Sequence, residues 1–386
     1  MTKYAVEIKT PNAFTQKDKT VWAGFRKGNP ALYSPYFHFG YTEVLGKLRT
    51  DVHVLCISRG GKTIAFLPFQ ADMNTNGKIG FARPIGAPMT DYHGFICAKG
   101  TRFDVTECMQ QAGFGAFHFS ALVENRNIRD VCIRSHSACT VMDVSKGAQA
   151  WREVRNSSYR RHLKNHRRRV RKSDELGVRK IVFNCKDKNV FDQLLSWKRA
   201  KFAETGKYDV LSTEWTRALL QTLWQEQGPH SDSGELHADM HALYFGDTLA
   251  AIDFGLSDGV TFHSWMVAYN NELQHLAPGI QLLEELIDGA EELGYDRIDL
   301  GEGSDGYKRH YASEDVQVAS GFIALSGPAA TLSQIYGAAE RFGENKLGTV
   351  GKLPGKARRR YGQIRACEPS LGGRAKAMLA AVKGAG

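Results

Sequence analysis

Runs of apolar residues divide the first 145 residues of the chain into strands that are separated by short polar turns. Strands are predicted over 52–59, 62–70, 78–86, 114–122 and 139–144. Gly60-Gly61 joins the first two strands by the two residues of a tight hairpin. A short helix is predicted over 101–113 and ends at Gly113. These elements predict a mixed α/β domain.

The second half of the chain alternates helical spacing with further strand patterns. Helices are predicted over 157–177, 189–206, 212–228 and 278–294, the last beginning at Pro278, where a missing N–H is tolerated. Strands are predicted over 178–185, 240–246, 248–257, 260–269, 295–301 and 318–325. The order is similar to that of the first half, so we expect two related α/β domains. The predicted boundaries are 1–150, 151–326 and a basic helical or flexible tail over 327–386.

Positive charge is concentrated in two segments of the chain. The formal net charge is +10, yet residues 151–180 and 341–386 each carry a net charge of +9, so the rest of the chain is acidic. The first segment contains RRHLKNHRRRVRK (160–172), which is predicted to lie on a helix between the two domains. Such a cluster can attract a phosphorylated substrate, an anionic membrane or a nucleic acid. Tyr159 is its one neighbouring aromatic residue and no nucleic-acid-reading motif is present, so nucleic acid is disfavoured.

Composition limits the cellular context and the cofactors. The longest apolar runs have the length of a strand, and the first residues contain no apolar signal-peptide core, so a cytoplasmic protein is expected. The seven cysteines form no CxxC pair, which predicts buried free thiols. Walker, HExxH and Ser/His/Asp patterns are missing, so no metal is expected.

One segment, DLGEGSDGYKRHYAS (299–313), is unusually crowded with glycine, carboxylate, tyrosine and basic residues directly after a predicted buried strand. An ordinary surface turn is one interpretation of this composition. The rim of an active site is the other, because a strand end and a helix start would converge on it. Pro278-Gly279 supplies that helix start, whose free N–H groups suit a pyrophosphate.

Residues 262–313 resemble the GNAT-fold acyltransferases of the FemAB and CelD-like branch. The resemblance rests on four short motifs in a fixed order, namely Ala268-Tyr269, Pro278-Gly279, Asp299-Leu300-Gly301 and Tyr307-Lys308. Thr90-Asp91-Tyr92 resembles the Ser-Asp-Tyr of the first domain in such proteins. The resemblance covers roughly residues 30–325, but the tight glycine-rich phosphate motif of simple GNAT enzymes is missing.

This resemblance implies tandem GNAT-like domains with mixed, mainly antiparallel sheets that are flanked by helices. It implies N-acyl transfer from acyl-CoA to an amine of an amino sugar or of another polysaccharide or cell-envelope precursor. FemAB relatives use aminoacyl-tRNA instead, so that donor stays open. A non-enzymatic polyanion- or RNA-binding protein is a further alternative. A lipid-linked saccharide acceptor would place the protein peripherally at the inner face of an anionic membrane.

The resemblance also assigns ligand-binding positions. The acyl donor is expected at Tyr269, Pro278, Gly279, Ile280, Gly301 and Gly303. The acceptor is expected to contact Asp91 and Tyr92 from the first domain, although a plain turn explains those two residues equally well.

N-acyl transfer also needs a base for the amine and donors for the oxyanion and the leaving thiolate. The candidate bases are Asp253, His263 and Glu302. Asp253 alternates with Ile252 and Phe254, which places its carboxylate on the opposite face of the strand. Lys308 and Tyr307 are the candidate donors. For each of these residues, a solvent-facing or purely structural role is the alternative.

Overall fold

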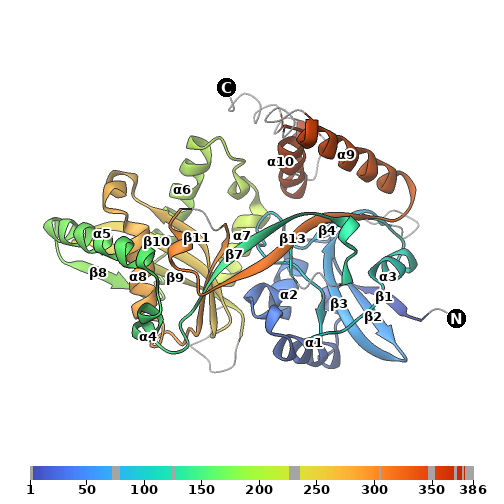
Figure 1. Cartoon of the computed structure of the whole chain (residues 1–386), viewed down its shortest axis with the longest axis horizontal. Coiled ribbons are helices and arrows are strands. Elements are labelled where there is room, and N and C mark those ends of the chain that lie inside the picture. The colour runs from blue at the N-terminus through green and yellow to red at the C-terminus, as the bar shows by residue number, and fades with distance from the viewer. Residues whose placement is uncertain are drawn as a thin grey trace. The chain divides into compact units, whose positions relative to one another are not determined.

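The computed structural model describes residues 3–71, 79–123, 127–225, 235–303, 306–346, 353–368, 372–375 and 378. The chain divides into two compact units that interleave along the sequence (Figure 1). Unit 1 comprises Met1–Ser137, Gly206–Leu219 and Val318–Gly386, and unit 2 comprises Ala138–Thr205 and Leu220–Gln317. The boundaries predicted after residues 150 and 326 differ from this division, because the chain returns to unit 1 twice.

The sheet of unit 1 follows the order β1-β2-β3-β4-β6-β13, and β5 pairs with β3. Its strands are β1 (Ala5–Lys9), β2 (Val52–Arg59), β3 (Lys62–Gln70), β4 (Ile79–Pro84), β5 (Ile96–Cys97), β6 (Phe114–Leu122) and the later part of β13 (Glu314–Ala324). β4 and β6 are parallel, whereas the other pairings in this order are antiparallel.

Five helices lie wholly within the described part of unit 1, and a sixth begins there. They are α1 (Gln16–Gly28), α2 (Phe39–Leu48), α3 (Val105–Gln111), α9 (Gly327–Lys346), α10 (Leu353–Cys367) and the start of α7 (Glu214–Gln225). α1 begins at a capping box in which Thr15 accepts from the Asp18 N–H and Asp18 accepts from the Thr15 N–H. The sequence analysis did not predict β1, α1 or α2.

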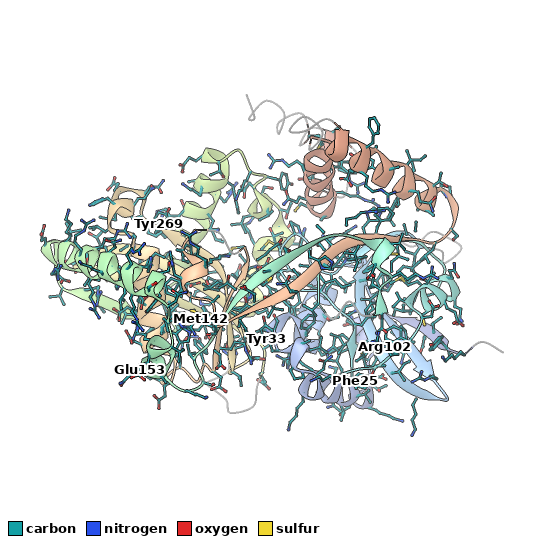
Figure 2. All side chains as sticks on the ribbon, in the orientation of Figure 1. Phe25, Tyr33, Arg102, Met142, Glu153 and Tyr269 are labelled. Atoms are coloured by element: carbon teal, nitrogen blue, oxygen red, sulfur yellow. The ribbon has the colours of Figure 1, made fainter. Side chains whose placement is uncertain are left out.

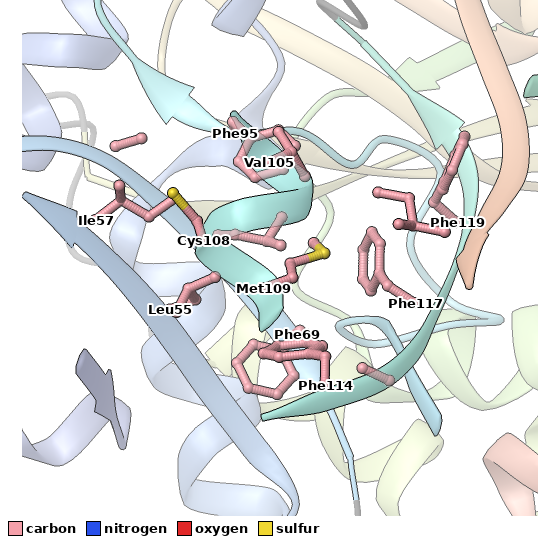
Figure 3. Close-up of a cluster of buried hydrophobic side chains, with 14 of the residues drawn as sticks. Leu55, Ile57, Phe69, Phe95, Val105, Cys108, Met109, Phe114, Phe117 and Phe119 are labelled. Carbon is pink, nitrogen blue, oxygen red and sulfur yellow. The ribbon is translucent and has the colours of Figure 1, made fainter. Parts of the chain in front are cut away.

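The core of unit 1 is formed by apolar side chains from its sheet and from α3 (Figure 3). Leu55 and Phe69 pack there with Phe114 and Phe117 of β6, and Met109 of α3 joins them. All five side chains are fully buried. Removal of this apolar surface from water is the main force that holds α3 on the sheet.

The sheet of unit 2 follows the order β7-β12-β11-β10-β9-β8. Its strands are the later part of β7 (Ile133–Asp143), β8 (Arg179–Val182), β9 (His237–Phe245), β10 (Thr248–Ser257), β11 (Thr261–Tyr269) and β12 (Arg297–Glu302). β11 and β12 are parallel, and the other pairings in this order are antiparallel.

Four helices lie within the described residues of unit 2, and α7 ends there. They are α4 (Ala148–Glu153), α5 (Ser157–Ser173), α6 (Lys188–Glu204) and α8 (Pro278–Asp288). α8 turns Leu282, Leu283, Leu286 and Ile287 into the core, which accounts for its contacts with β9, β10 and β11. The predicted basic helix is α5, and it belongs to unit 2.

The two units share one arrangement. Each contains a single parallel pair within the sheet orders given above, and a helix lies between those two strands in the sequence. That helix is α3 in unit 1 and α8 in unit 2. Two related α/β units were predicted from the order of elements alone.

The predicted strands over 52–59, 62–70, 114–122 and 248–257 are confirmed at their bounds. The strands predicted over 139–144 and 318–325 were too short, because β7 begins at Ile133 and β13 at Glu314. None of the seven cysteines, all of which are described, forms a disulfide bond, and all except Cys132 are buried as predicted. Among the described helices, none is long and apolar enough to cross a membrane.

Candidate active site

β11 and β12 separate partway along their length. They pair in parallel at Thr261–Arg297, Phe262–Ile298 and His263–Asp299, and both strands are fully described. β11 then continues to Tyr269 and β12 to Glu302 without further pairing between them. Backbone groups of β11 beyond His263 are therefore not committed to β12, which leaves them available on that side to an extended ligand.

A β-bulge lies directly after this point. The register between β10 and β11 shifts between Phe254 and Gly255, so that Trp265 is the extra residue of β11. A bulge bends its strand, and here the bend follows the last pair with β12. Gly255 is required on the partner strand, because a Cβ there would lie 2.2 Å from the Phe262 ring.

Asp253 of β10 lies beside this bulge and is buried. The hydroxyl of Ser264 lies 2.9 Å and 2.8 Å from its two carboxylate oxygens. Burial raises the pKa of Asp253 to about 6, although the Ser264 hydrogen bond and the charges of His263 and Lys198 act to lower it. Asp253 is thus ionised at neutral pH but can accept a proton, as a general base must.

Tyr307 follows β12 and interacts electrostatically with the carboxylate of Asp253. Desolvation of its hydroxyl, and secondly that carboxylate, raise the pKa of Tyr307 to about 12, although the residue as a whole is 37% exposed. Its ring meets the Tyr311 ring edge to face at a centroid distance of 6.2 Å. The tyrosine is therefore protonated at neutral pH and can donate a hydrogen bond or a proton.

Lys308 fastens the loop that the sequence analysis singled out. Its Nζ donates to the carbonyl oxygens of Leu300 at 2.6 Å and of Glu302 at 2.9 Å. Two of its three N–H groups are therefore directed at the end of β12. The side chain of Glu302 itself is exposed.

His263 and Asp299 form a pair at the last parallel register position. Both are fully buried, and His263 Nδ1 lies 3.5 Å from Asp299 Oδ1. The same carboxylate oxygen accepts the Gly301 N–H at 2.7 Å, where Gly301 adopts φ +71°. Asp299 therefore orders the turn at the end of β12.

Gly303 is held on both sides. Its N–H donates to Ala138 at 3.0 Å and its carbonyl accepts from the Thr140 hydroxyl at 3.2 Å. Its φ of +108° is one that side chains of L-residues rarely adopt. The next two residues of the loop lie outside the described part of the chain.

The first turn of α8 lies against the end of β11. A Cβ at Gly279 would be 3.5 Å from Val267 and 3.7 Å from Tyr269, the last residue of β11 (Figure 2). Ala277 before the helix adopts φ +51° and supplies no side-chain cap. The N–H groups of Ile280 and the next residue donate to the Ala277 carbonyl, whereas no hydrogen bond between described residues uses the Gly279 N–H.

The N-terminus of α3, the equivalent helix of unit 1, differs from that of α8. The Asp104 carboxylate accepts the Glu107 N–H at 3.0 Å and so caps the N-terminus of α3 with a negative charge. An anion is disfavoured at α3 for that reason and favoured at α8, where no side chain competes.

Asp91 and Tyr92 lie in unit 1. Tyr92 is buried and accepts a hydrogen bond from the Tyr33 hydroxyl at 3.1 Å, while Asp91 is half-buried. Thr90 lies 2.6 Å from the Tyr41 hydroxyl. Contact between these residues and an acceptor stays a prediction.

Two residues around Asp253 were missed by the sequence analysis. Ser264 could have been found, because it lies on the strand that follows the Asp253 hairpin. Lys198 of α6 gave no signal, since its proximity to Asp253 arises from packing of α6 on β11. Its Nζ lies 3.4 Å from the Val267 carbonyl oxygen.

One comparison with known proteins matches the part of the chain that contains this candidate site. A family model described as an acetyltransferase (GNAT) domain matches residues 157–309, which span α5, the bulged strand, α8 and Lys308. A search of curated proteins finds no match.

Solved structures resemble most of the chain. FemX matches with a TM-score of 0.50 and 9% identity over 85% of this chain and 99% of that one. A tandem GNAT protein from the clavulanic acid biosynthesis pathway gives 0.46 and 9% over 84% and 99%. The C-terminal domain of a putative lysylphosphatidylglycerol synthetase from Agrobacterium fabrum gives 0.46 and 11% over 81% and 96%.

The chain therefore has a tandem GNAT-like α/β fold, and residues 157–309 within it match the model of a GNAT acetyltransferase domain. The predicted fold class is confirmed. The finer resemblance to the CelD-like branch, and the roles of the individual site residues, stay predictions.

Proposed function

We propose that the chain transfers an acyl group from acyl-CoA to the amine of an amino sugar or a related cell-envelope precursor. The observation that carries the proposal is Asp253, a buried carboxylate with a pKa of about 6 beside the point where β11 and β12 part. It lies within the segment that the GNAT family model matches.

Donor binding is assigned to α8 and the end of β11. The uncapped N-terminus of α8 offers the Gly279 N–H to a pyrophosphate, and Pro278 and Ile280 shape that turn. Tyr269 would line the same end of β11, and Gly301 and Gly303 would keep the facing loop narrow. Because Asp104 caps α3, we expect one donor per chain, in unit 2.

The reaction is one nucleophilic substitution at the thioester carbonyl. The amine nitrogen bonds to the carbonyl carbon while its proton passes to Asp253. Backbone N–H groups of β11 beyond His263 would hold the oxyanion. The carbon–sulfur bond then breaks, and Tyr307 supplies a proton to the leaving thiolate.

The other predicted residues take supporting parts in this scheme. Lys308 holds the loop and adds positive charge near the reacting carbonyl, while His263 and Asp299 fix the strand ends. Glu302, with its exposed side chain, is the alternative base. Asp91 and Tyr92 are proposed to contact the acceptor.

A second candidate donor is aminoacyl-tRNA. The observation that favours it is the row of exposed cations on α5. In either case we place the protein in the cytoplasm, with a lipid-linked saccharide as one acceptor that would bring it to the inner membrane face.

Calorimetry with acetyl-CoA and a longer acyl-CoA tests the donor. The proposal expects micromolar binding at one site per chain that Asp253→Asn leaves intact. Release of free CoA with an amino sugar should then fall by about 10²- to 10⁴-fold in that variant. Failure of both thioesters to bind would reject acyl-CoA and favour aminoacyl-tRNA.

A further inference from the structure

α5 presents a face of positive charge. Its 17 residues contain eight Lys or Arg and no Asp or Glu. Seven of the eight cations are exposed: Arg160, Arg161, Lys164, Arg167, Arg168, Arg171 and Lys172. None of the seven forms an ion pair with a residue that the structure describes. Within the described part of the chain, no carboxylate offsets the mutual repulsion of these seven cations by direct pairing, so an external anion would relieve it.

The opposite side of α5 is fixed to the body of unit 2. Tyr159 is buried and its hydroxyl lies 3.2 Å from both carboxylate oxygens of Glu284 on α8. Glu284 also receives Arg152 at 2.9 Å and the Tyr311 hydroxyl at 2.9 Å. The charged face is thus rigidly presented, because the helix cannot turn over without breaking this buried network.

Exposed aliphatic side chains flank the same helix. Val154 precedes it and is 73% exposed, while Leu176 and Val178 follow it and are 50% and 85% exposed. Asp174 and Glu175 interrupt the positive charge between the helix and these last two side chains. Aliphatic side chains at both ends of a cationic helix gain free energy at a boundary between lipid head groups and acyl chains.

We propose that the cationic face of α5, with Val154, Leu176 and Val178, docks the protein on an anionic membrane surface. Single-stranded nucleic acid is bound through cations together with exposed aromatic rings. The one tyrosine of α5 is only 1% exposed, and the exposed apolar side chains beside it are aliphatic. These features favour a lipid surface over RNA.

This docking adds a membrane-binding surface to the proposed function without depending on acyl transfer, and α5 also contacts the loop of the candidate site. His310 follows Lys308, and its ring stacks on His162 of α5 at a centroid distance of 4.9 Å. The Ser158 hydroxyl lies 3.0 Å from His310 Nδ1. The helix that carries the cationic face is therefore in direct contact with the segment that follows Tyr307 and Lys308.

The experiment is flotation of the full chain with phosphatidylcholine vesicles that contain or lack phosphatidylglycerol. One quadruple variant replaces cations of α5 (R167Q/R168Q/R171Q/K172Q). Its matched control replaces four exposed lysines of unit 1 (K17Q/K27Q/K47Q/K62Q). Both lose the same charge, so a difference between them reports position. A third variant, L176S/V178S, tests the aliphatic contribution.

We expect binding to the anionic vesicles alone. Each cation near an anionic surface contributes roughly fivefold to partition, so the α5 variant should bind at least about tenfold more weakly while the control changes little. L176S/V178S should lose the binding that persists at high salt. Release of CoA with a soluble amine should stay unchanged in the α5 variant, which separates docking from catalysis.

Three results would overturn the proposal. Equal binding to neutral vesicles would remove the role of charge. Equal loss in both quadruple variants would reduce the effect to net charge. Binding of a bulk tRNA mixture that depends on the α5 cations, without any preference for anionic vesicles, would assign the face to nucleic acid.

Discussion

Ser264 and Asp253 are joined across the β10–β11 bulge, with the serine hydroxyl 2.9 Å and 2.8 Å from the two carboxylate oxygens. One hydroxyl hydrogen serves both oxygens, so the bond favours the ionised form of Asp253. Burial acts in the opposite direction and dominates, which leaves the pKa at about 6. The pair thus sets the proton affinity of the proposed base.

Ser264→Ala should move the pH dependence of acyl transfer. Loss of the hydrogen bond raises the pKa of Asp253, so the acidic limb of kcat against pH should shift upward by about one pH unit. Turnover at high pH should be nearly retained. An unshifted limb would separate Asp253 from the rate-limiting proton transfer, and Ser264→Thr, which keeps the hydroxyl, is the control.

Asp253→Asn should stabilise the protein at neutral pH while it removes activity. The folded pKa of about 6 exceeds the ordinary value of 3.8, so the folded chain binds this proton more tightly than the unfolded chain. The resulting stability is present below pH 3.8 and is lost as the pH rises through 6. We expect a gain of about 1–3 kcal/mol in the free energy of unfolding at pH 8, shrinking towards pH 4. Thermal denaturation across this pH range measures it, and a variant less stable at pH 8 would contradict it.

Lys308→Ala should increase the mobility of the loop more than it weakens donor binding. The substitution removes the ammonium from the carbonyl oxygens of Leu300 and Glu302. We expect faster amide hydrogen exchange across 300–303 and at least a tenfold fall in kcat/KM, since misplacement near the reacting atoms is costly. Arg309→Ala, in the same turn and exposed, is the control. Unchanged exchange together with lost activity would give Lys308 a direct role instead.

Glu284→Ala should be among the most destabilising single changes in unit 2. The carboxylate is 4% exposed and receives Arg152, Tyr159 and Tyr311. Its removal leaves a guanidinium and two hydroxyl groups without their buried acceptor, at a cost of about 3–5 kcal/mol. Denaturant unfolding measures this cost. Glu291→Ala, on an exposed glutamate, should change stability by less than about 0.5 kcal/mol.

Gly255→Ala should distort the bulge. Its Cβ would lie 2.2 Å from the Phe262 ring and 2.5 Å from the His263 carbonyl, and the latter is backbone that cannot easily move. A loss of about 1–3 kcal/mol and a weakened acyl-CoA complex are expected. Gly24→Ala in α1, where nothing lies within 4 Å, should instead stabilise by about 0.5–1 kcal/mol. Comparable losses in both variants would show that the bulge is not special.

The sequence predicted those elements whose ends are marked by turn residues. β10 is bounded by Gly246-Asp247 and Asp258-Gly259, and its bounds were found. The predicted ranges of β7 and β13 were too short. Arg134, His136 and the polar start of β13 break the apolar pattern of strands that are held by pairing rather than by burial. α1 was missed although its capping box, Thr15 and Asp18, can be recognised in the sequence.

The site was predictable to a smaller extent. Alternation along β10 predicted that the Asp253 side chain lies on the opposite face of the strand from Phe254. The change from strand to helix pattern predicted that Gly279 lies in the first turn of a helix. The bulge at Trp265 and the approach of Lys198 depend on register and helix packing, which no local pattern encodes. Lys308 was predicted as a catalytic donor, whereas its two backbone contacts also give it a structural task.

The interleaving of the two units has a consequence for the order of events during synthesis. β13 supplies unit 1 with a strand that pairs with β6, at Ala319–Leu122 and onward, yet it is made after nearly all of unit 2. When the last strand of unit 2 has been synthesised, the first 137 residues still lack β13, the strand that pairs with the edge of β6. A fragment ending near residue 150 would keep that edge open, so the N-terminal half should be a poor candidate for expression alone.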